Sequence, residues 1–569
     1  MTDLLPGQLA YVFGVSILDA ALLSWVALLW YRRSVRRLMR ERGPETVAPP
    51  AEPQQTAAPI AHTSSNERLE EFSLTEEPPE STTARTSIIP RAGQRRVMLA
   101  YAAGAAAYAA VITTLKFTAE PSPLPAVAWL AEWWMNTWPI VPTLVALLVL
   151  DRPAIVRLAL HYLVGGAIAI ALFTVVGQIL RGTLNTAPLT NVFWAMVGVG
   201  WAAWLPLALI AVTGWRRVRA VTPLVLAATL LFGFGSILSR ELLTRALDVV
   251  SFRSFVLNSA ALSSPGTVQY LLFMLVSLGV GWIAWRLLTG LADAFAKKRF
   301  SDVQLVIDCW WAVVAAEVTA TSLSITHGFA GIAGGIAAFL AYRVSVFAVL
   351  RGVHPAAIAP RRLLLLRVFG YQARTESLFD RVAQAWRFHG PVQLIAGVDL
   401  AMRTADPGDL LALLNGRLAE LYVSTPEDVS NRLARLDFRT DPDGRFRINE
   451  VYCYDNTWRP TLEALLDASD IVLMDLRSFS AGNAGCVFEL QQLVGRLASD
   501  DIVFVCDKTT DLPLLRNILR DAWTTAREAG RARGASVISV IRVERNSRAE
   551  LGVLMRRLLV LPPELRLKV

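Results

Sequence analysis

Histidine and cysteine are scarce in this chain, and with them the usual ligands of metal sites and the means to build disulfide frameworks. The 569 residues include 5 histidines and 4 cysteines. No Cys-x-x-Cys pair occurs, and no histidine lies beside a cysteine at metal-ligand spacing, so we expect neither a metal site nor a disulfide. Phosphate-loop, Gly-x-Gly-x-x-Gly, Gly-x-Ser-x-Gly and His-Glu-x-x-His motifs are also missing from the sequence, which argues against the chemistries that depend on them.

Charged residues are few as well. They make up 18% of the chain, against 54% hydrophobic residues and 17 tryptophans. This balance predicts a multi-pass membrane protein whose first partner is the lipid bilayer. The net charge of +9 would suggest nucleic acid in a soluble protein. However, no basic stripe interleaved with aromatic residues occurs, so we expect no nucleic-acid partner.

Apolar runs long enough to cross a bilayer occur repeatedly before residue 355. We predict a polytopic α-helical membrane domain, with a first span and its basic flank in 1–40 and about eight further spans in 97–355. The predicted spans are 9–31, 97–115, 126–150, 157–180, 190–214, 221–239, 269–292, 303–325 and 328–350.

Basic residues next to these spans predict the orientation. Arg32 and Arg33 follow the first span, and Lys297, Lys298 and Arg299 lie between two later ones, whereas the opposite ends carry few positive charges. Because cytoplasmic flanks collect Arg and Lys, we place the N-terminus outside and the C-terminal domain in the cytoplasm. The abundance of Ala, Arg and Leu is typical of a GC-rich bacterial genome, which favours the bacterial inner membrane.

The segment 41–96 differs from its neighbours. It is rich in Pro, Glu, Ser and Thr and shows no apolar periodicity. Such a segment buries too little apolar surface to compensate the entropy of ordering it. We therefore predict a disordered cytoplasmic linker between the first span and the rest of the membrane domain.

Some predicted spans contain ionisable residues, which are functional candidates because their burial in lipid is costly. They are Asp19, Glu132, Asp308, Glu317 and Arg343. One interpretation is a proton or cation path, as in a transporter. The other is that the acidic residues pair with Arg343, which we favour because the two halves show no repeat and no matching broken spans.

From Arg361 onward, short apolar runs alternate with amphipathic segments, as in βαβ units. We predict strands at 363–369, 392–395, 471–476, 502–506 and 536–541. We predict helices near 375–388, 408–421, 458–468, 484–498, 512–529 and 547–558, with a long insertion at about 425–455. The domain 360–569 is thus predicted to be a flavodoxin-like α/β domain with a parallel sheet, whose ligands bind at the carboxyl ends of the strands.

Motifs in this domain resemble Toll/interleukin-receptor (TIR) domains. Gly485-Cys-Val-Phe-Glu-Leu490 is similar to the family box Trp-Cys-x-x-Glu-Leu, with glycine in place of tryptophan. Val368-Phe-Gly-Tyr371 looks like the opening Phe-x-Ser-Tyr, with glycine in place of serine. Arg403-Thr-Ala-Asp-Pro-Gly408 resembles Arg-Asp-x-x-Pro-Gly, with threonine in place of the first aspartate. The matches occur in the family's order.

The resemblance implies a chemistry and a site. Some TIR domains cleave the nicotinamide–ribose bond of NAD, with the helix glutamate as the essential carboxylate, a role that would fall to Glu489. NAD would then be a substrate and not a permanently bound cofactor. Phe369 and Tyr371 would line the nicotinamide side, and Arg403 would meet the phosphates through its planar fork. Two further residues complete the predicted nucleotide contacts. Asp475 lies at the end of the strand that precedes the box, and Ser480 lies in the loop between that strand and the box.

Other interpretations of these residues remain open. Glu489 could satisfy the dipole at the start of its helix, and Asp475 could cap the loop after its strand. The function we expect is a membrane-anchored signalling or defence protein, a homo-oligomer and a possible NAD glycohydrolase. One alternative is a non-enzymatic TIR-like or Rossmann-like interaction module that assembles through loops near 397–410 and 478–485. A further alternative is a transporter with a regulatory C-terminal domain.

Overall fold

The computed structural model consists of two compact units. The helical unit comprises Met1–Arg33, Ala92–His354 and Arg403–Leu418, and the sheet unit comprises Ser34–Arg91, Pro355–Met402 and Ala419–Val569. The residues that the structure describes are 25–38, 73–77, 91–119, 125–137, 139–147, 160, 164, 248–259, 265–327, 329–351, 360–368, 372–396, 407–454, 456–531 and 537–559.

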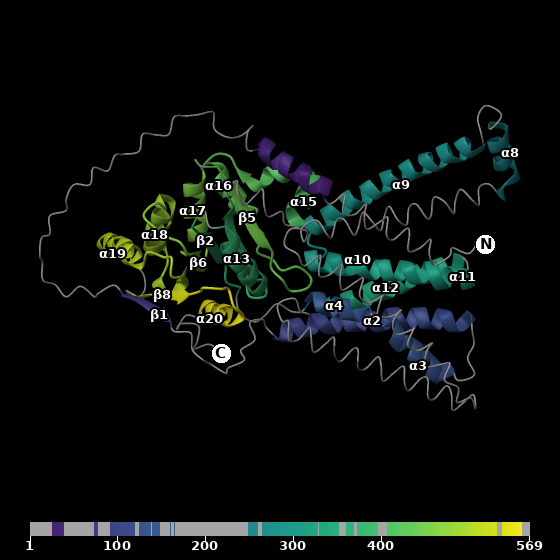
Figure 1. Ribbon diagram of the computed structural model, residues 1–569, viewed down its shortest axis with the longest axis horizontal. Helices are drawn as coiled ribbons and strands as arrows, with labels where there is room; N and C mark the ends of the chain where they lie inside the picture. The colour runs from purple at the N-terminus through teal and green to yellow at the C-terminus, as the bar shows by residue number, and fades with distance from the viewer. Residues whose placement is uncertain are drawn as a thin grey trace, which may run out of the picture. The chain divides into compact units, whose positions relative to one another are not determined.

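The helical unit contains long helices and short connecting ones (Figure 1). Their bounds are α2 Arg91–Ala119, α3 Pro125–Asn136, α4 Ile140–Leu147, α8 Val250–Ser259, α9 Pro265–Ala296, α10 Asp302–Val318, α11 Ser324–His327, α12 Phe329–Arg351 and α15 Pro407–Leu414. A π-helical turn, Thr319–Leu323, joins α10 to α11. A further helix covers 25–38.

Aromatic side chains from three helices form the core of the helical unit. Trp311 of α10 stacks on Tyr342 of α12 with ring centroids 4.7 Å apart, and Tyr108 of α2 meets Trp311 edge-on at 5.1 Å. The buried Trp311 also donates its indole N–H to Thr143 Oγ1. Glycine lets the helices approach closely, because a Cβ at Gly335 would lie 1.8 Å from Thr319 Oγ1.

Two of the described helices are long and apolar enough to cross a membrane, Gln94–Thr118 and Ala330–Arg351. They coincide with the predicted spans 97–115 and 328–350. The polytopic domain of nine spans is therefore not reproduced over the described residues. The predicted spans 190–214 and 221–239, and most of 9–31 and 157–180, lie outside them.

Other predicted spans are interrupted. The run 126–150 forms two helices, α3 and α4, and 303–325 is divided by the π-helical turn. Pro139 lies between α3 and α4, where it lacks a backbone N–H and disfavours helical geometry in the residue before it. Apolar composition predicted both runs but carried no information on these breaks. The run 269–292 lies inside the continuous helix α9.

The candidate ionisable residues of the predicted spans are paired where the structure describes their side chains. Asp308 of α10 accepts hydrogen bonds from the Tyr342 hydroxyl at 3.0 Å and from the Arg343 guanidinium, both on α12. The predicted pairing of Asp308 with Arg343 is confirmed. Glu132 pairs instead with Lys116 at 2.6 Å, whereas Asp19 and the Glu317 side chain lie outside the described residues.

The sheet unit is built around eight parallel strands in the order β1-β8-β7-β6-β2-β3-β5-β4 (Figure 1). Their bounds are β1 Ser73–Glu77, β2 Leu363–Arg367, β3 Val392–Ala396, β4 Tyr422–Val423, β5 Ile448–Cys453, β6 Ile471–Asp475, β7 Ile502–Cys506 and β8 Val537–Arg542. The α/β prediction is confirmed. The five predicted strands are β2, β3, β6, β7 and β8, and among themselves they take the flavodoxin-like order 2-1-3-4-5.

Three strands were not predicted. The insertion at 425–455 contains α16 (Asp428–Ala434) and β5, and β4 lies just before it. Polar Asn449 and Glu450 interrupt β5, so it lacks the continuous apolar run expected of a strand buried on both faces. β1 lies within the segment predicted as a disordered linker, and at its five residues the structure differs from that prediction. It pairs with β8 through its backbone, from Ser73 opposite Val537 onward, and its sequence has only one apolar residue to signal it.

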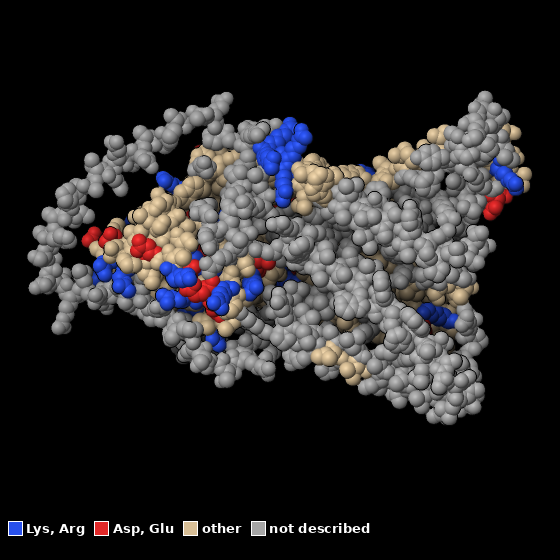
Figure 2. Space-filling model, viewed as in Figure 1, with Lys and Arg blue, Asp and Glu red and all other residues tan. Residues whose placement is uncertain are grey.

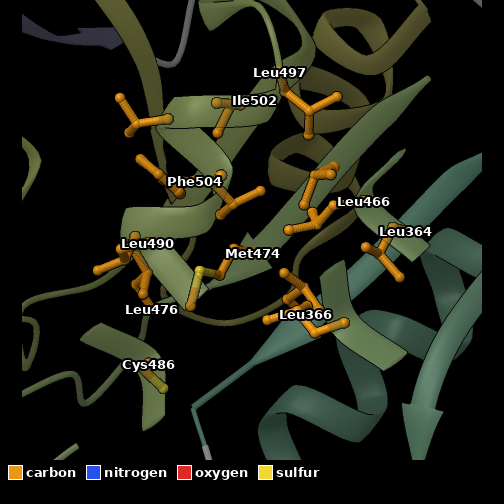
Figure 3. Packing of buried hydrophobic residues seen from close by; sticks show 14 of the residues in the cluster. Leu364, Leu366, Leu466, Met474, Leu476, Cys486, Leu490, Leu497, Ile502 and Phe504 are labelled. Carbon is orange, nitrogen blue, oxygen red and sulfur yellow. The ribbon is translucent and has the colours of Figure 1, made fainter. Parts of the chain in front are cut away.

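Five amphipathic helices accompany the central strands. They are α13 Gln372–Trp386, α17 Trp458–Asp467, α18 Ala484–Arg496, α19 Leu512–Glu528 and α20 Arg548–Leu559, close to the predicted bounds. Figure 3 shows how Leu490 of α18 packs near Met474 of β6 and Phe504 of β7 in one apolar cluster. Each of these three side chains is fully buried. The core thereby holds α18 in a defined place on the sheet.

Candidate functional site

The sheet reverses its strand order between β2 and β6, and the residues at the carboxyl ends of these strands form the candidate site. β2 and β6 pair along their whole length, with Arg367 opposite Asp475. One residue further, the Val368 N–H donates to the Asp475 carbonyl at 3.1 Å. In open parallel sheets this reversal leaves a crevice at the carboxyl edge, where ligands bind.

A buried ion pair lies at the carboxyl end of β6. Arg477 donates through Nε and Nη2 to the two carboxylate oxygens of Asp475, at 2.8 and 2.7 Å, and through Nη1 to Asn546 Oδ1 at 2.8 Å. Both charged side chains are fully buried. The paired geometry compensates for the loss of hydration. Asp475, a predicted nucleotide contact, is therefore placed at the site with both oxygens engaged by its own loop.

The loop from β6 to α18 is held by local hydrogen bonds. Ser478 adopts a left-handed conformation with φ of 64°. Its hydroxyl and backbone N–H contact Thr509 Oγ1. Ser480, the other predicted contact on this loop, is exposed, and its N–H donates to Asn483 Oδ1 at 2.9 Å. The loop leads directly into α18, which begins at Ala484.

Glu489 is buried in α18, with 3% of its surface exposed. Its Oε2 atom has no hydrogen-bond partner among the described residues. Burial raises the pKa of the Glu489 carboxyl to about 8, and the positive charge of Arg367 opposes this rise. A buried polar oxygen without a hydrogen-bond partner lowers the free energy of unfolding by about 1–3 kcal/mol. Packing alone therefore does not explain a glutamate at this position.

The helix-dipole interpretation of Glu489 is wrong. The first turn of α18 contains no acidic residue, because the helix begins at Ala484 and Glu489 lies in its second turn. The dipole acts within the first turn. The side chain also points into the core and not to solvent, since its neighbour Leu490 and the preceding Cys486 are buried with it. Burial beside Arg367 is what distinguishes this carboxylate.

The remaining predicted residues lie outside the described part of the chain. They are Phe369, Tyr371 and Arg403. The structure places Asp475 at the end of β6, Ser480 in the loop after it and Glu489 in the helix that follows, and it does not describe the others. Among the described residues, no group of three or more His, Cys, Asp or Glu side chains could hold a metal ion.

Sequence reasoning missed Arg367, which closes the run Leu-Leu-Leu-Leu-Arg of β2. It is 6% exposed, and its carbonyl lies 3.9 Å from the thiol of Cys486, one turn before Glu489. A charged residue that ends a fully buried strand was a visible signal. Asp507, directly after β7, accepts from the Thr509 N–H at 2.9 Å and so caps its own loop.

The arrangement offers one carboxyl group without a hydrogen-bond partner on Oε2, next to an arginine, at the edge where parallel sheets bind ligands. Such a group can exchange a proton near neutral pH or stabilise a developing positive charge. Comparison with known proteins found no matching family model, no similar characterised protein and no similar solved structure.

Proposed function

We propose that this chain is a membrane-anchored signalling or defence protein whose TIR-like sheet unit cleaves the nicotinamide–ribose bond of NAD, with Glu489 as the essential carboxylate. The observation that carries the proposal is the buried, incompletely hydrogen-bonded carboxyl of Glu489 at the switch point of a flavodoxin-like sheet. The motif resemblance around Gly485–Leu490 supports the same residue.

The chemistry requires an anionic group near a developing cation. Cleavage of the bond from ribose to the nicotinamide nitrogen passes through an oxocarbenium-like state. The nicotinamide nitrogen takes the bonding electron pair and leaves as neutral nicotinamide, and water adds to the ribosyl carbon and loses a proton. An ionised Glu489 would stabilise the positive charge on the ribose. Since its pKa is about 8 in the free protein, the positively charged nicotinamide ring of the substrate favours the ionised form of Glu489 as it binds.

The membrane part of the proposal rests on the helical unit. Apolar side chains on one side of α12 face outward, including Ile336 at 58% and Val344 at 65% exposure. Helix α9 carries a similar set, with Leu275 at 66% and Leu278 at 68%. Figure 2 shows the surface of α9 almost entirely without charged residues, whereas both signs of charge gather over the sheet unit. Lipid is the solvent that suits such faces.

The test is NAD consumption by the full chain, purified in detergent and reconstituted in lipid. We expect nicotinamide release by the wild type and none above background with Glu489→Gln, which keeps the shape and removes the ionisable group. Glu528→Gln, an exposed position on α19, is the matched control and should keep full activity. Release of nicotinamide by Glu489→Gln at the wild-type rate would refute the assignment.

An interaction module is the second candidate. The loop Ser480–Gly482 is exposed at the same edge of the sheet and is free to meet another copy of the chain. On this hypothesis Glu489→Gln leaves function unchanged, and replacement of Ser480 by a bulky residue prevents assembly. Analytical ultracentrifugation of the reconstituted protein, with and without the substitution, separates this function from catalysis. A transporter is less favoured, because Asp308 is already paired with Arg343.

A further inference from the structure

A second cluster of side chains lies next to Gly485, apart from the ion pair and the loop that follow β6. Trp458 begins α17, and its ring atom Cη2 is 4.0 Å from where a Cβ of Gly485 would stand. The same indole meets Phe488 of α18 edge-on, with ring centroids 5.5 Å apart. The indole of Trp458 thus packs beside the first turns of α18, where the box in TIR domains has a tryptophan and this chain has glycine.

These two rings hold an arginine. The Arg459 guanidinium lies 5.5 Å from the Trp458 ring centroid and 5.1 Å from that of Phe488. Arg459 is exposed, and no ion pair with a carboxylate is found for it among the described residues. Stacking on aromatic rings orients the planar fork without occupying its N–H donors.

The surroundings of Arg459 favour an anion. Arg459 lies in the first turn of α17, and Gly485 lies in the first turn of α18. Neither helix has a side-chain cap, because the Thr457 hydroxyl is bound to the Val423 carbonyl and Asn483 Oδ1 to Ser480. The Trp458 N–H is bound to the Tyr454 carbonyl, so the start of α17 contributes mainly through its dipole. The positive ends of the α17 and α18 dipoles lie beside the Trp458–Phe488 pair on which Arg459 stacks.

Glu489 is on the same helix as Gly485 and Phe488 of this cluster. It follows Phe488 in the chain and is four residues after Gly485, so Gly485 and Glu489 share one face of α18. Helical side chains lean toward the N-terminus, which directs Glu489 toward the turn that Trp458 covers. The buried Oε2 of Glu489, without a hydrogen-bond partner among the described residues, is an independent sign that this edge accommodates a ligand.

We propose that Arg459, held by Trp458 and Phe488, binds the diphosphate of a dinucleotide whose ribosyl bond lies at Glu489. This inference rests on the proposed function and adds a substrate-binding residue to it. It assigns to Arg459 the contact with the phosphates that the resemblance implied for Arg403. A planar guanidinium stacked on the rings at the start of two helices without side-chain caps suits a diphosphate better than a single carboxylate, since two anionic groups can be met at once.

The test uses the full chain carrying Glu489→Gln, so that no substrate is consumed, and measures Kd for ADP and for adenosine by calorimetry. We expect Arg459→Gln to weaken ADP binding at least about tenfold, as loss of a charged hydrogen bond does, and to leave adenosine unchanged. Arg520→Gln, an exposed arginine on α19, removes the same charge elsewhere and should change neither. Trp458→Leu should weaken ADP like Arg459→Gln, and Trp458→Phe should restore it.

Equal ADP affinity in the Arg459→Gln and Arg520→Gln proteins would overturn the inference. So would equal weakening of ADP and adenosine, which would indicate a structural defect and not a phosphate contact. Arg403→Gln is measured in parallel, and loss of ADP binding there alone would assign the phosphates to Arg403 instead. Because binding is read without turnover, failure of NAD cleavage in the wild type would refute the proposed function and leave the Arg459 result interpretable.

Discussion

Both units hold acidic groups away from solvent, but they treat them differently. In the helical unit, the partly buried Asp308 is met by Arg343 and the Tyr342 hydroxyl. In the sheet unit, Asp475 is met by Arg477 in the same way, whereas Glu489 keeps an oxygen without a hydrogen-bond partner among the described residues. A paired buried charge is explained by the fold, since the partner compensates its desolvation. An incompletely paired one costs stability and therefore points to function.

The largest difference between these carboxyl groups should appear in activity. Glu489→Gln should lower NAD cleavage by about 10³-fold or more, in line with the loss of one group that stabilises transition-state charge. Asp308→Asn should leave the rate of cleavage by the reconstituted protein within about twofold of the wild type, because the fold accounts for that group. Nicotinamide release by the two variants, measured side by side, tests this difference. A lower rate for Asp308→Asn than for Glu489→Gln would contradict it.

For the free energy of unfolding of the sheet unit, we expect the paired carboxylate, Asp475, to matter more than Glu489. Asp475→Asn leaves the fully buried Arg477 without its charged partner and should destabilise the unit by about 3–5 kcal/mol. Glu489→Gln should not destabilise it at pH 8.5, since it removes a buried charge that has no complete set of partners. Thermal unfolding of both variants checks this.

The double variant Asp475→Asn with Arg477→Gln provides the control for Asp475. It removes both charges and should recover part of the loss. If the double variant were as unstable as the sum of its parts, the pair would not be coupled, and the comparison between paired and unpaired groups would lose its basis.

The pH dependence of stability sharpens the comparison further. The native Glu489 carboxyl, with a pKa of about 8, holds a proton that the unfolded chain releases above its ordinary pKa. The native state therefore binds more protons between about pH 4.5 and 8, and its stability falls as pH rises through this window, by up to several kcal/mol. On the proposed function, NAD cleavage should rise over the same window, because it is the ionised carboxylate that stabilises the positive charge on the ribose.

Denaturation of the wild type and of Glu489→Gln from pH 5 to 8.5 tests this behaviour. The difference in stability between them should shift steadily in favour of the variant as pH rises. A constant difference across the range would show that Glu489 does not titrate there, and that its burial is compensated by a partner outside the described residues.

The smallest effect on stability is expected at Glu550, a carboxylate near the surface that accepts hydrogen bonds from backbone N–H groups. Glu550 accepts from the Ser547 N–H at 2.6 Å and the Glu544 N–H at 2.8 Å. Partial burial opposes ionisation of Glu550, but these hydrogen bonds prevail and hold its pKa below the ordinary value. Its contribution is present above the ordinary pKa of glutamate and is lost as pH falls below it.

Glu550→Ala should therefore destabilise the protein by about 1 kcal/mol at pH 7 and by less at pH 3, as loss of a helix N-terminal capping interaction does. Thermal unfolding at the two pH values measures the difference. An equal loss at both would mean that packing of the side chain, and not its charge, holds the start of α20.

The sequence indicated several parts of the site and missed others for identifiable reasons. The short apolar run at 471–476 predicted β6, and the amphipathic segment at 484–498 predicted α18, both of which the structure contains. Arg367 could not be connected to Glu489 in this way. The two residues are far apart in the chain and are brought near each other only because β2 pairs with β6.

Periodicity and composition by themselves determined the α/β domain, its central strands and the amphipathic helices over them, because the burial of one face leaves a local pattern in the chain. Tertiary structure alone decided what local patterns do not carry. Backbone pairing recruits β1 and the partly polar β5 to the sheet, and helix packing seats Trp458 against Gly485. It also decided which acids found partners, since Asp308 meets Arg343 across two helices while Glu489 is buried by the core that holds α18.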